Sequence, residues 1–146
     1  MSDTPASDET LISAMRTAVA LERDALDALD RALGEPALAA VRLMAGVKGR
    51  VICAGVGKSG HVARKIAATL ASTGTPAQFV HPSEASHGDL GMITAQDAVV
   101  ALSNSGNTPE LADIIAYTRR FGIPLVAIVG REKSVLTERA DVGLLL

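Results

Sequence analysis

Two imidazole and two carboxylate side chains crowd into nine consecutive residues near the middle of the chain. They belong to His81, Glu84, His87 and Asp89. Imidazole and carboxylate groups commonly transfer protons near neutral pH, so this segment favours general acid–base chemistry. An ordinary connector, in which Ser83 caps a short helical turn and the histidines bond to the backbone, explains the same residues. The residues alone leave both interpretations open.

A metal site has less support in this segment. His81 can supply one ligand, but a single histidine makes no complete zinc site and no second spaced pair of ligands is evident. Cys53 is the only cysteine, which excludes an internal disulfide and a multi-thiolate zinc site. Its apolar neighbours predict that it lies in a buried strand. We therefore expect chemistry that requires no cofactor.

A glycine-rich segment, residues 55–60 (GVGKSG), follows the first predicted strand and matches the dinucleotide pattern G-x-G-x-x-G. Such sites also need an acidic residue about 20 positions later, and residues 79–82 contain none. A P-loop needs a further glycine where this chain has isoleucine. What remains is an anion site at a helix N-terminus, with donors from the Gly57 backbone, Lys58 and Ser59. The alternative is a tight strand-to-helix turn with a solvated lysine.

A second polar loop, residues 103–108 (SNSGNT), follows the third predicted strand. Thr108 and Pro109 predict a helix start there, as N-cap and first helical residue. The loop offers hydroxyl and amide donors with little net charge, which suits a phosphate monoester better than a metal or a nucleobase. An unusually polar turn is the alternative. The residues available to an anionic substrate are Ser103, Asn104, Ser105, Gly106, Asn107 and Thr108.

Short apolar runs that alternate with helical stretches must position these loops. The runs predict five strands, and the stretches between them predict helices near residues 60–73, 108–121 and 134–140. This alternation is typical of an α/β fold with a doubly wound, five-stranded parallel sheet. In the flavodoxin-like order 2-1-3-4-5, the loops after the first and third strands flank one ligand-binding crevice. The predicted strands cover residues 51–54, 78–80, 98–102, 125–129 and 142–146.

An N-terminal helical extension precedes the sheet. Ser7 predicts the N-cap of a long amphipathic helix that Gly34 ends, and a second, shorter helix follows. We therefore divide the chain into N-terminal helices over residues 1–48 and a single globular domain over residues 49–146. The final residues read as a central strand, so we expect the natural protein to continue beyond Leu146.

Composition excludes several classes of protein. The formal net charge is -2 and aromatic residues make up 2% of the chain, so neither phosphate neutralisation nor base stacking favours nucleic acid. The N-terminus is acidic where a signal peptide would be basic, and no apolar run approaches the roughly 20 residues of a spanning helix. We expect a cytoplasmic protein that binds no membrane.

Three segments together resemble the arabinose 5-phosphate isomerases, which contain a sugar isomerase (SIS) domain. They are residues 55–61 (GVGKSGH), 81–92 (HPSEASHGDLGM) and 103–106 (SNSG). The resemblance implies interconversion of D-ribulose 5-phosphate and D-arabinose 5-phosphate, a step toward the Kdo sugar of lipopolysaccharide. It also implies a homo-oligomer, a dimer or tetramer, and a chain truncated before a closing helix, further active-site residues and CBS domains.

The same resemblance assigns roles to individual residues. It places Lys58, His87 and Glu110 at catalytic positions, Gly74 and Thr75 at the substrate, residues 103–108 at its phosphate, and His81 at a zinc ion. Gly57 and Ser59 of the first loop join the predicted substrate-binding residues. Moving a carbonyl between C1 and C2 requires a base and donors that stabilise an enediolate. Glu110 is a candidate base, His87 a proton relay and Lys58 a charge donor. Complementing a helix dipole is the alternative role of Glu110.

Two other functions compete with isomerisation. SIS domains also act as regulatory modules that bind a phosphosugar without catalysis, and the histidine segment argues against that role here. Sensors of this kind often carry a basic helix-turn-helix, whereas residues 1–33 are acidic and predict one long helix. A nucleotide-binding oxidoreductase ranks last because the ribose-binding acid is missing.

Overall fold

The computed structural model describes residues 6–146, which belong to two compact units, Met1–Gly34 and Glu35–Leu146. Residues 1–5, which include Asp3 and argued against a signal peptide, lie outside the described residues. The first unit is the helix α1 (Asp8–Ala32), none of whose residues is buried. The Ser7 hydroxyl accepts a hydrogen bond from the Thr10 amide at 3.2 Å, so Ser7 is the N-cap that the sequence predicts. No helix within residues 6–146 has the length and apolar character needed to cross a membrane.

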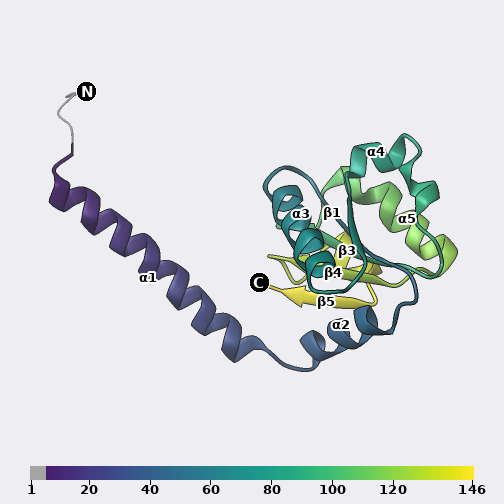
Figure 1. Cartoon of the computed structure of the whole chain (residues 1–146), viewed down its shortest axis with the longest axis horizontal. Coiled ribbons are helices and arrows are strands. Elements are labelled where there is room, and N and C mark those ends of the chain that lie inside the picture. Colours follow the sequence, from purple (N-terminus) through teal and green to yellow (C-terminus); the bar gives the residue numbers. More distant parts are fainter. Residues whose placement is uncertain (1–5) are drawn as a thin grey trace. The chain divides into compact units, whose positions relative to one another are not determined.

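The second unit is a five-stranded parallel sheet in the order β2-β1-β3-β4-β5, with helices on both faces (Figure 1). The predicted fold class and strand order are therefore confirmed. The strands are β1 (Val51–Gly55), β2 (Ala77–Val80), β3 (Ala98–Ser103), β4 (Leu125–Val129) and β5 (Val142–Leu145). The helices are α2 (Glu35–Gly46), α3 (Gly57–Ser72), α4 (Pro82–Ser86), α5 (Ala112–Phe121) and α6 (Val135–Arg139), with 3-10 turns η1 (Asp89–Met92) and η2 (Pro109–Leu111).

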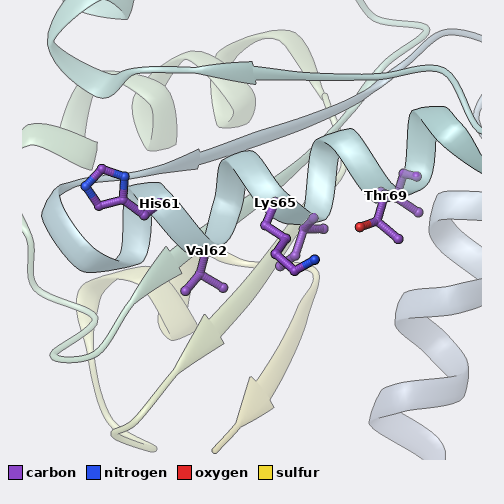
Figure 2. A pocket seen from close by; sticks show the side chains of 6 residues that line it. His61, Val62, Lys65 and Thr69 are labelled. Atoms are coloured by element: carbon purple, nitrogen blue, oxygen red, sulfur yellow. The ribbon is translucent and has the colours of Figure 1, made fainter.

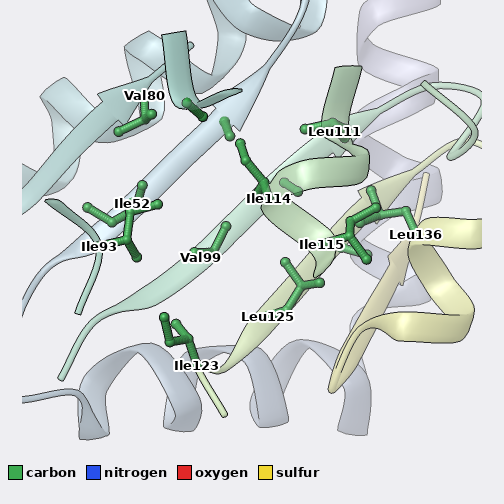
Figure 3. Close-up of a cluster of buried hydrophobic side chains, with 14 of the residues drawn as sticks. Ile52, Val80, Ile93, Val99, Leu111, Ile114, Ile115, Ile123, Leu125 and Leu136 are labelled. Carbon is green, nitrogen blue, oxygen red and sulfur yellow. The ribbon is translucent and has the colours of Figure 1, made fainter. Parts of the chain in front are cut away.

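Strand side chains alternate between two hydrophobic cores, one on each face of the sheet. On one face, Ile52, Val99 and Leu125 pack against α5, which contributes Ile114 and Ile115 (Figure 3). On the other face, alternate residues of the same strands pack against α3 and α2. Because the strands are buried on both faces, they appear in the sequence as continuous apolar runs.

The second core contains Cys53 of β1 and Ala40 of α2. Cys53 is fully buried in it, as predicted, and burial raises the pKa of its thiol to about 11. Ala40 of α2 is 1% exposed and packs in the same core. Helix α2 therefore shares its core with the sheet, whereas the division at residue 48 grouped it with α1.

A buried carboxylate holds the amino ends of β1 and β3 together. Asp97 is 2% exposed and accepts hydrogen bonds from the Arg50 amide at 2.6 Å and from the Thr94 amide at 2.7 Å. The Thr94 hydroxyl donates a third bond at 3.0 Å. Burial alone would raise the pKa of Asp97, but these bonds and the nearby Arg50 charge outweigh it and lower the pKa.

Replacing Asp97 by Ala is expected to reduce the free energy of unfolding by about 2–4 kcal/mol at pH 7, since two buried amides lose their acceptor. The folded pKa lies below the unfolded one, so the ionised carboxylate stabilises the fold above the unfolded pKa. That contribution is lost as the pH falls through the folded pKa, so the difference between the two proteins should start to shrink below about pH 4. Urea unfolding at pH 7 and at lower pH measures both effects, with the exposed Asp113→Ala as control. A difference independent of pH would contradict the assignment.

Candidate functional site

The loops singled out in the sequence leave neighbouring strands at the same edge of the sheet. All strands are parallel, and β1 pairs with β3 so that Gly55 lies beside Leu102. Residues 55–60 and residues 103–108 therefore both lie at the carboxyl edge, where open α/β sheets bind ligands. The geometry is the one that the predicted strand order requires.

Each glycine of the first loop has its own structural reason. A Cβ on Gly60 would lie 2.7 Å from the Gly55 carbonyl oxygen, so these two glycines allow α3 to pack closely on β1. Gly57 has a φ of +57° with open space around it, which leaves the backbone accessible. Val56 stands at the N-cap of α3 and supplies no capping side chain. Lys58 is exposed and, within residues 6–146, its side chain has no hydrogen-bond or ion-pair partner.

Ser103 organises the second loop from within. Its side chain is buried, and its Oγ accepts a hydrogen bond from the Gly106 amide at 2.9 Å and lies 2.7 Å from the Thr108 Oγ1. Thr108 is the N-cap of the 3-10 turn η2 and Pro109 is its first residue, as the sequence predicts, but the Thr108 hydroxyl bonds to Ser103 and caps no backbone amide. The α-helix α5 starts only at Ala112.

The segment after β4 and the first turn of α6 support this second loop. Sequence reasoning missed this contact. The Gly130 amide donates to the Asn104 carbonyl oxygen at 3.1 Å, and the Leu136 amide donates to the Gly106 carbonyl oxygen at 3.0 Å. A side chain completes the contact, since the Asn107 Oδ1 accepts from a further amide of α6. One signal was available: β4 neighbours β3 in the predicted order, so the loops after these two strands must lie side by side.

The histidine segment forms the short helix α4 and the turn that follows it. His81, and not Ser83, is the N-cap, since its Nδ1 accepts a hydrogen bond from the Ser83 amide at 3.2 Å. The proposed serine cap was therefore wrong. His87 and Asp89 are exposed. The described residues contain no group of three or more His, Cys, Asp or Glu side chains that could hold a metal ion.

The remaining predicted residues divide between the two edges of the sheet. Glu110 is exposed in η2, directly after the second loop, and α4 contacts η2, so His87 and Glu110 belong to the same end of the domain. Gly74 and Thr75 follow α3 and precede β2, at the amino edge. Helix α3 has 16 residues and spans about 24 Å at 1.5 Å per residue. Within one chain, this length separates Gly74 and Thr75 from Lys58.

A shallow groove runs along the outer face of α3 (Figure 2). Its volume is about 560 Å³, and all its lining side chains come from α3 between His61 and Leu70. Lys58 and the second loop do not line it. The groove therefore lies apart from the candidate site at the carboxyl edge.

A family model describes the fold and this site together. The model of the SIS domain matches residues 44–146, and the chain belongs to the SIS domain family. The matched region contains every loop of the carboxyl edge described above. The predicted membership of the sugar isomerase domain family is confirmed.

Individual relatives extend this comparison. The arabinose 5-phosphate isomerase KdsD of Pseudomonas aeruginosa is 54% identical over 132 residues, which cover 90% of this chain and 40% of the relative. KdsD of Escherichia coli K12 is 49% identical over 126 residues, or 86% of this chain and 38% of the relative. The chain thus spans about 40% of the length of these relatives. The structure of E. coli CFT073 c3406 in complex with A5P superposes with a TM-score of 0.83 at 34% identity, covering 96% of this chain and 74% of that one.

Proposed function

We propose that this chain is the substrate-binding domain of an aldose–ketose isomerase that interconverts D-ribulose 5-phosphate and D-arabinose 5-phosphate. One observation carries the proposal: a lysine-bearing anion loop and a loop rich in hydroxyls and amides leave adjacent strands at one edge of the sheet. The KdsD relatives and the c3406 complex with A5P support this choice of substrate. The role in lipopolysaccharide synthesis, the cytoplasmic location and the homo-oligomer belong to the same proposal.

In the proposed site, residues 103–108 bind the phosphate with backbone amides and hydroxyls. This fixes the sugar so that its C1 and C2 face the groups at the same edge. Glu110 takes a proton from one carbon and returns it to the other, while Lys58 stabilises the enediolate oxygen. His87 relays protons between the two oxygens. The loop after β3 thus binds the phosphate, and the groups proposed for the chemistry follow three different strands, β1, β2 and β3.

We expect no cofactor to be required for this reaction, because shifting a carbonyl by one carbon is redox-neutral overall. Zinc remains a proposal at His81. The Nδ1 of that ring already accepts the Ser83 amide, so Nε2 would be the atom that binds a metal. The protein described here offers only this one histidine at that position, so a bound zinc would need ligands from elsewhere.

Incubation of the full natural protein that contains this chain with ribulose 5-phosphate in deuterated water tests the proposal. Arabinose 5-phosphate that carries solvent-derived deuterium is the expected product, because the proton that Glu110 removes from carbon exchanges with solvent before one is returned. NMR of the sugar protons follows both events. Binding of ribulose 5-phosphate without product would favour the regulatory module that binds a phosphosugar without catalysis. If the protein binds neither ribulose 5-phosphate nor arabinose 5-phosphate, both functions are contradicted.

A further inference from the structure

The side chain of Asn107 points toward α6, away from the role of substrate donor that the sequence suggested for it. Its Oδ1 accepts a hydrogen bond from the Val135 amide at 2.9 Å. Its Nδ2 donates to the Ser105 carbonyl oxygen at 3.3 Å, and its own amide donates to the Ser105 Oγ at 3.2 Å. Both functional atoms of the side chain therefore have a partner within the protein, and the Oδ1 bond to α6 fixes the direction of the side chain.

The same loop supplies the hydrogen-bond acceptors for the first two backbone amides of α6. The Val135 amide bonds to Asn107, and the Leu136 amide bonds to the Gly106 carbonyl oxygen at 3.0 Å. The third amide, that of Thr137, bonds to the Ser134 Oγ in a reciprocal capping box. All three N-terminal donors of this five-residue helix have partners, so the helix end is an anchor for the loop and has no free donors for an anion.

From these contacts we propose that Asn107 is a positioning residue: its bond to the first amide of α6 holds residues 103–108 in the conformation that binds phosphate. This inference rests on the proposed function, since the loop must bind the phosphate for its conformation to matter. The bond joins positions 28 residues apart in the chain. It therefore links the conformation of the binding loop after β3 to the position of α6, the helix that follows the neighbouring strand β4.

Val135→Pro breaks this bond from the helix side without changing the loop. Proline lacks the N–H, and the first helical position tolerates it because its φ is already suitable. Ser134 has φ -160° and ψ 162°, the extended conformation that a residue before proline requires. The Val135 side chain is 54% exposed, so little core packing is lost. Val135→Ala, which keeps the N–H, is the matched control.

Titration with ribulose 5-phosphate and with inorganic phosphate provides the first measurement. Asn107→Ala and Val135→Pro should each raise the Kd about three- to tenfold, as expected for the loss of one hydrogen bond. The Kd of the double variant should be no higher than that of the single variant that binds more weakly. Val135→Ala should bind like the wild type. Full additivity, or unchanged binding in Val135→Pro, would overturn the proposal.

Asn107→Asp separates positioning from direct contact with the ligand. Aspartate keeps an oxygen for the Val135 amide, so a positioning role predicts slower exchange of the Gly106 amide in Asn107→Asp than in Asn107→Ala. The comparison is made without ligand, because the carboxylate repels phosphate whichever role Asn107 has. Equal exchange in these two variants would overturn the assignment.

Amide hydrogen exchange tests positioning without any ligand. The Gly106 amide, which donates to Ser103, should exchange faster in Asn107→Ala and Val135→Pro than in Val135→Ala. If the wild type binds neither sugar phosphate nor phosphate, the proposed function fails, and this measurement still decides whether Asn107 orders the loop. Equal exchange in all variants would contradict the proposal even if the protein binds its substrate.

Discussion

Replacing Lys58 by Met is expected to lower the turnover of ribulose 5-phosphate by more than tenfold. One oriented charge donor is typically worth at least about 1.4 kcal/mol in the transition state, which corresponds to that factor. Lys58 is exposed in the first turn of α3, and within residues 6–146 it has no partner that would give it a structural role. The free energy of unfolding should therefore stay unchanged while kcat falls. Initial rates by NMR and urea unfolding measure the two quantities.

A second lysine on the same helix provides the control for this prediction. Lys65 is also exposed, but it lines the groove on the outer face of α3 (Figure 2). Lys65→Met removes the same charge from the same helix and should leave kcat within about twofold of the wild type. Equal losses in both variants would show that the effect is a general one of net charge. Unchanged turnover in Lys58→Met would remove this lysine from the mechanism.

The fold was predictable because its strands carry an unambiguous signal. Each predicted strand, such as residues 98–102, is a short apolar run between helical stretches, and both faces of the sheet are covered. The alternation predicts parallel strands, and the order 2-1-3-4-5 was predicted as the flavodoxin-like one of the common doubly wound arrangements. Both are confirmed. The weaker point was α2, because its three-residue spacing predicts a helix but not which core receives it.

The details of the site were harder to predict because they depend on side-chain hydrogen bonds. The sequence of residues 103–108 shows donors, but not that Thr108 bonds to Ser103 or that Asn107 bonds to α6. His81 was singled out for its chemistry, whereas its role as the cap of α4 depends on ring orientation. Which of several equivalent partners a polar side chain bonds to depends on the folded structure, so local sequence propensity does not predict it.

Gly106→Ala is expected to weaken phosphate binding about 100-fold and to lower the free energy of unfolding by about 2–5 kcal/mol. Gly106 has a φ of +67°, and a Cβ there would collide with the Cβ and Oγ of Ser134. Positive φ costs an alanine roughly 1–2 kcal/mol and overpacking adds about 1–3. Relief of the collision would move the loop from α6, and a displacement of about 1 Å is enough to cost two orders of magnitude at a site.

Gly122→Ala separates the two terms of this prediction. Gly122 ends α5 with a φ of +62°, close to that of Gly106, but a Cβ there would meet nothing within 4 Å. Its substitution should cost only the roughly 1–2 kcal/mol of backbone strain and leave phosphate binding unchanged. Calorimetric titration with ribulose 5-phosphate and urea unfolding of both variants measure the difference. Equal effects of the two alanines would show that the contact with α6 contributes nothing.

A compensating substitution completes the test of Gly106. Ser134→Gly removes the two atoms that the new Cβ would meet, and glycine at an N-cap costs only a few tenths of a kcal/mol relative to serine. The next nearest atom, Cγ1 of Val129, lies at 3.4 Å, an ordinary contact distance. The double variant should therefore bind phosphate more tightly than Gly106→Ala alone, although the strain of positive φ remains. If the double variant binds no better, the collision with α6 is not what disables the loop, and the conformation of Gly106 itself must be the requirement.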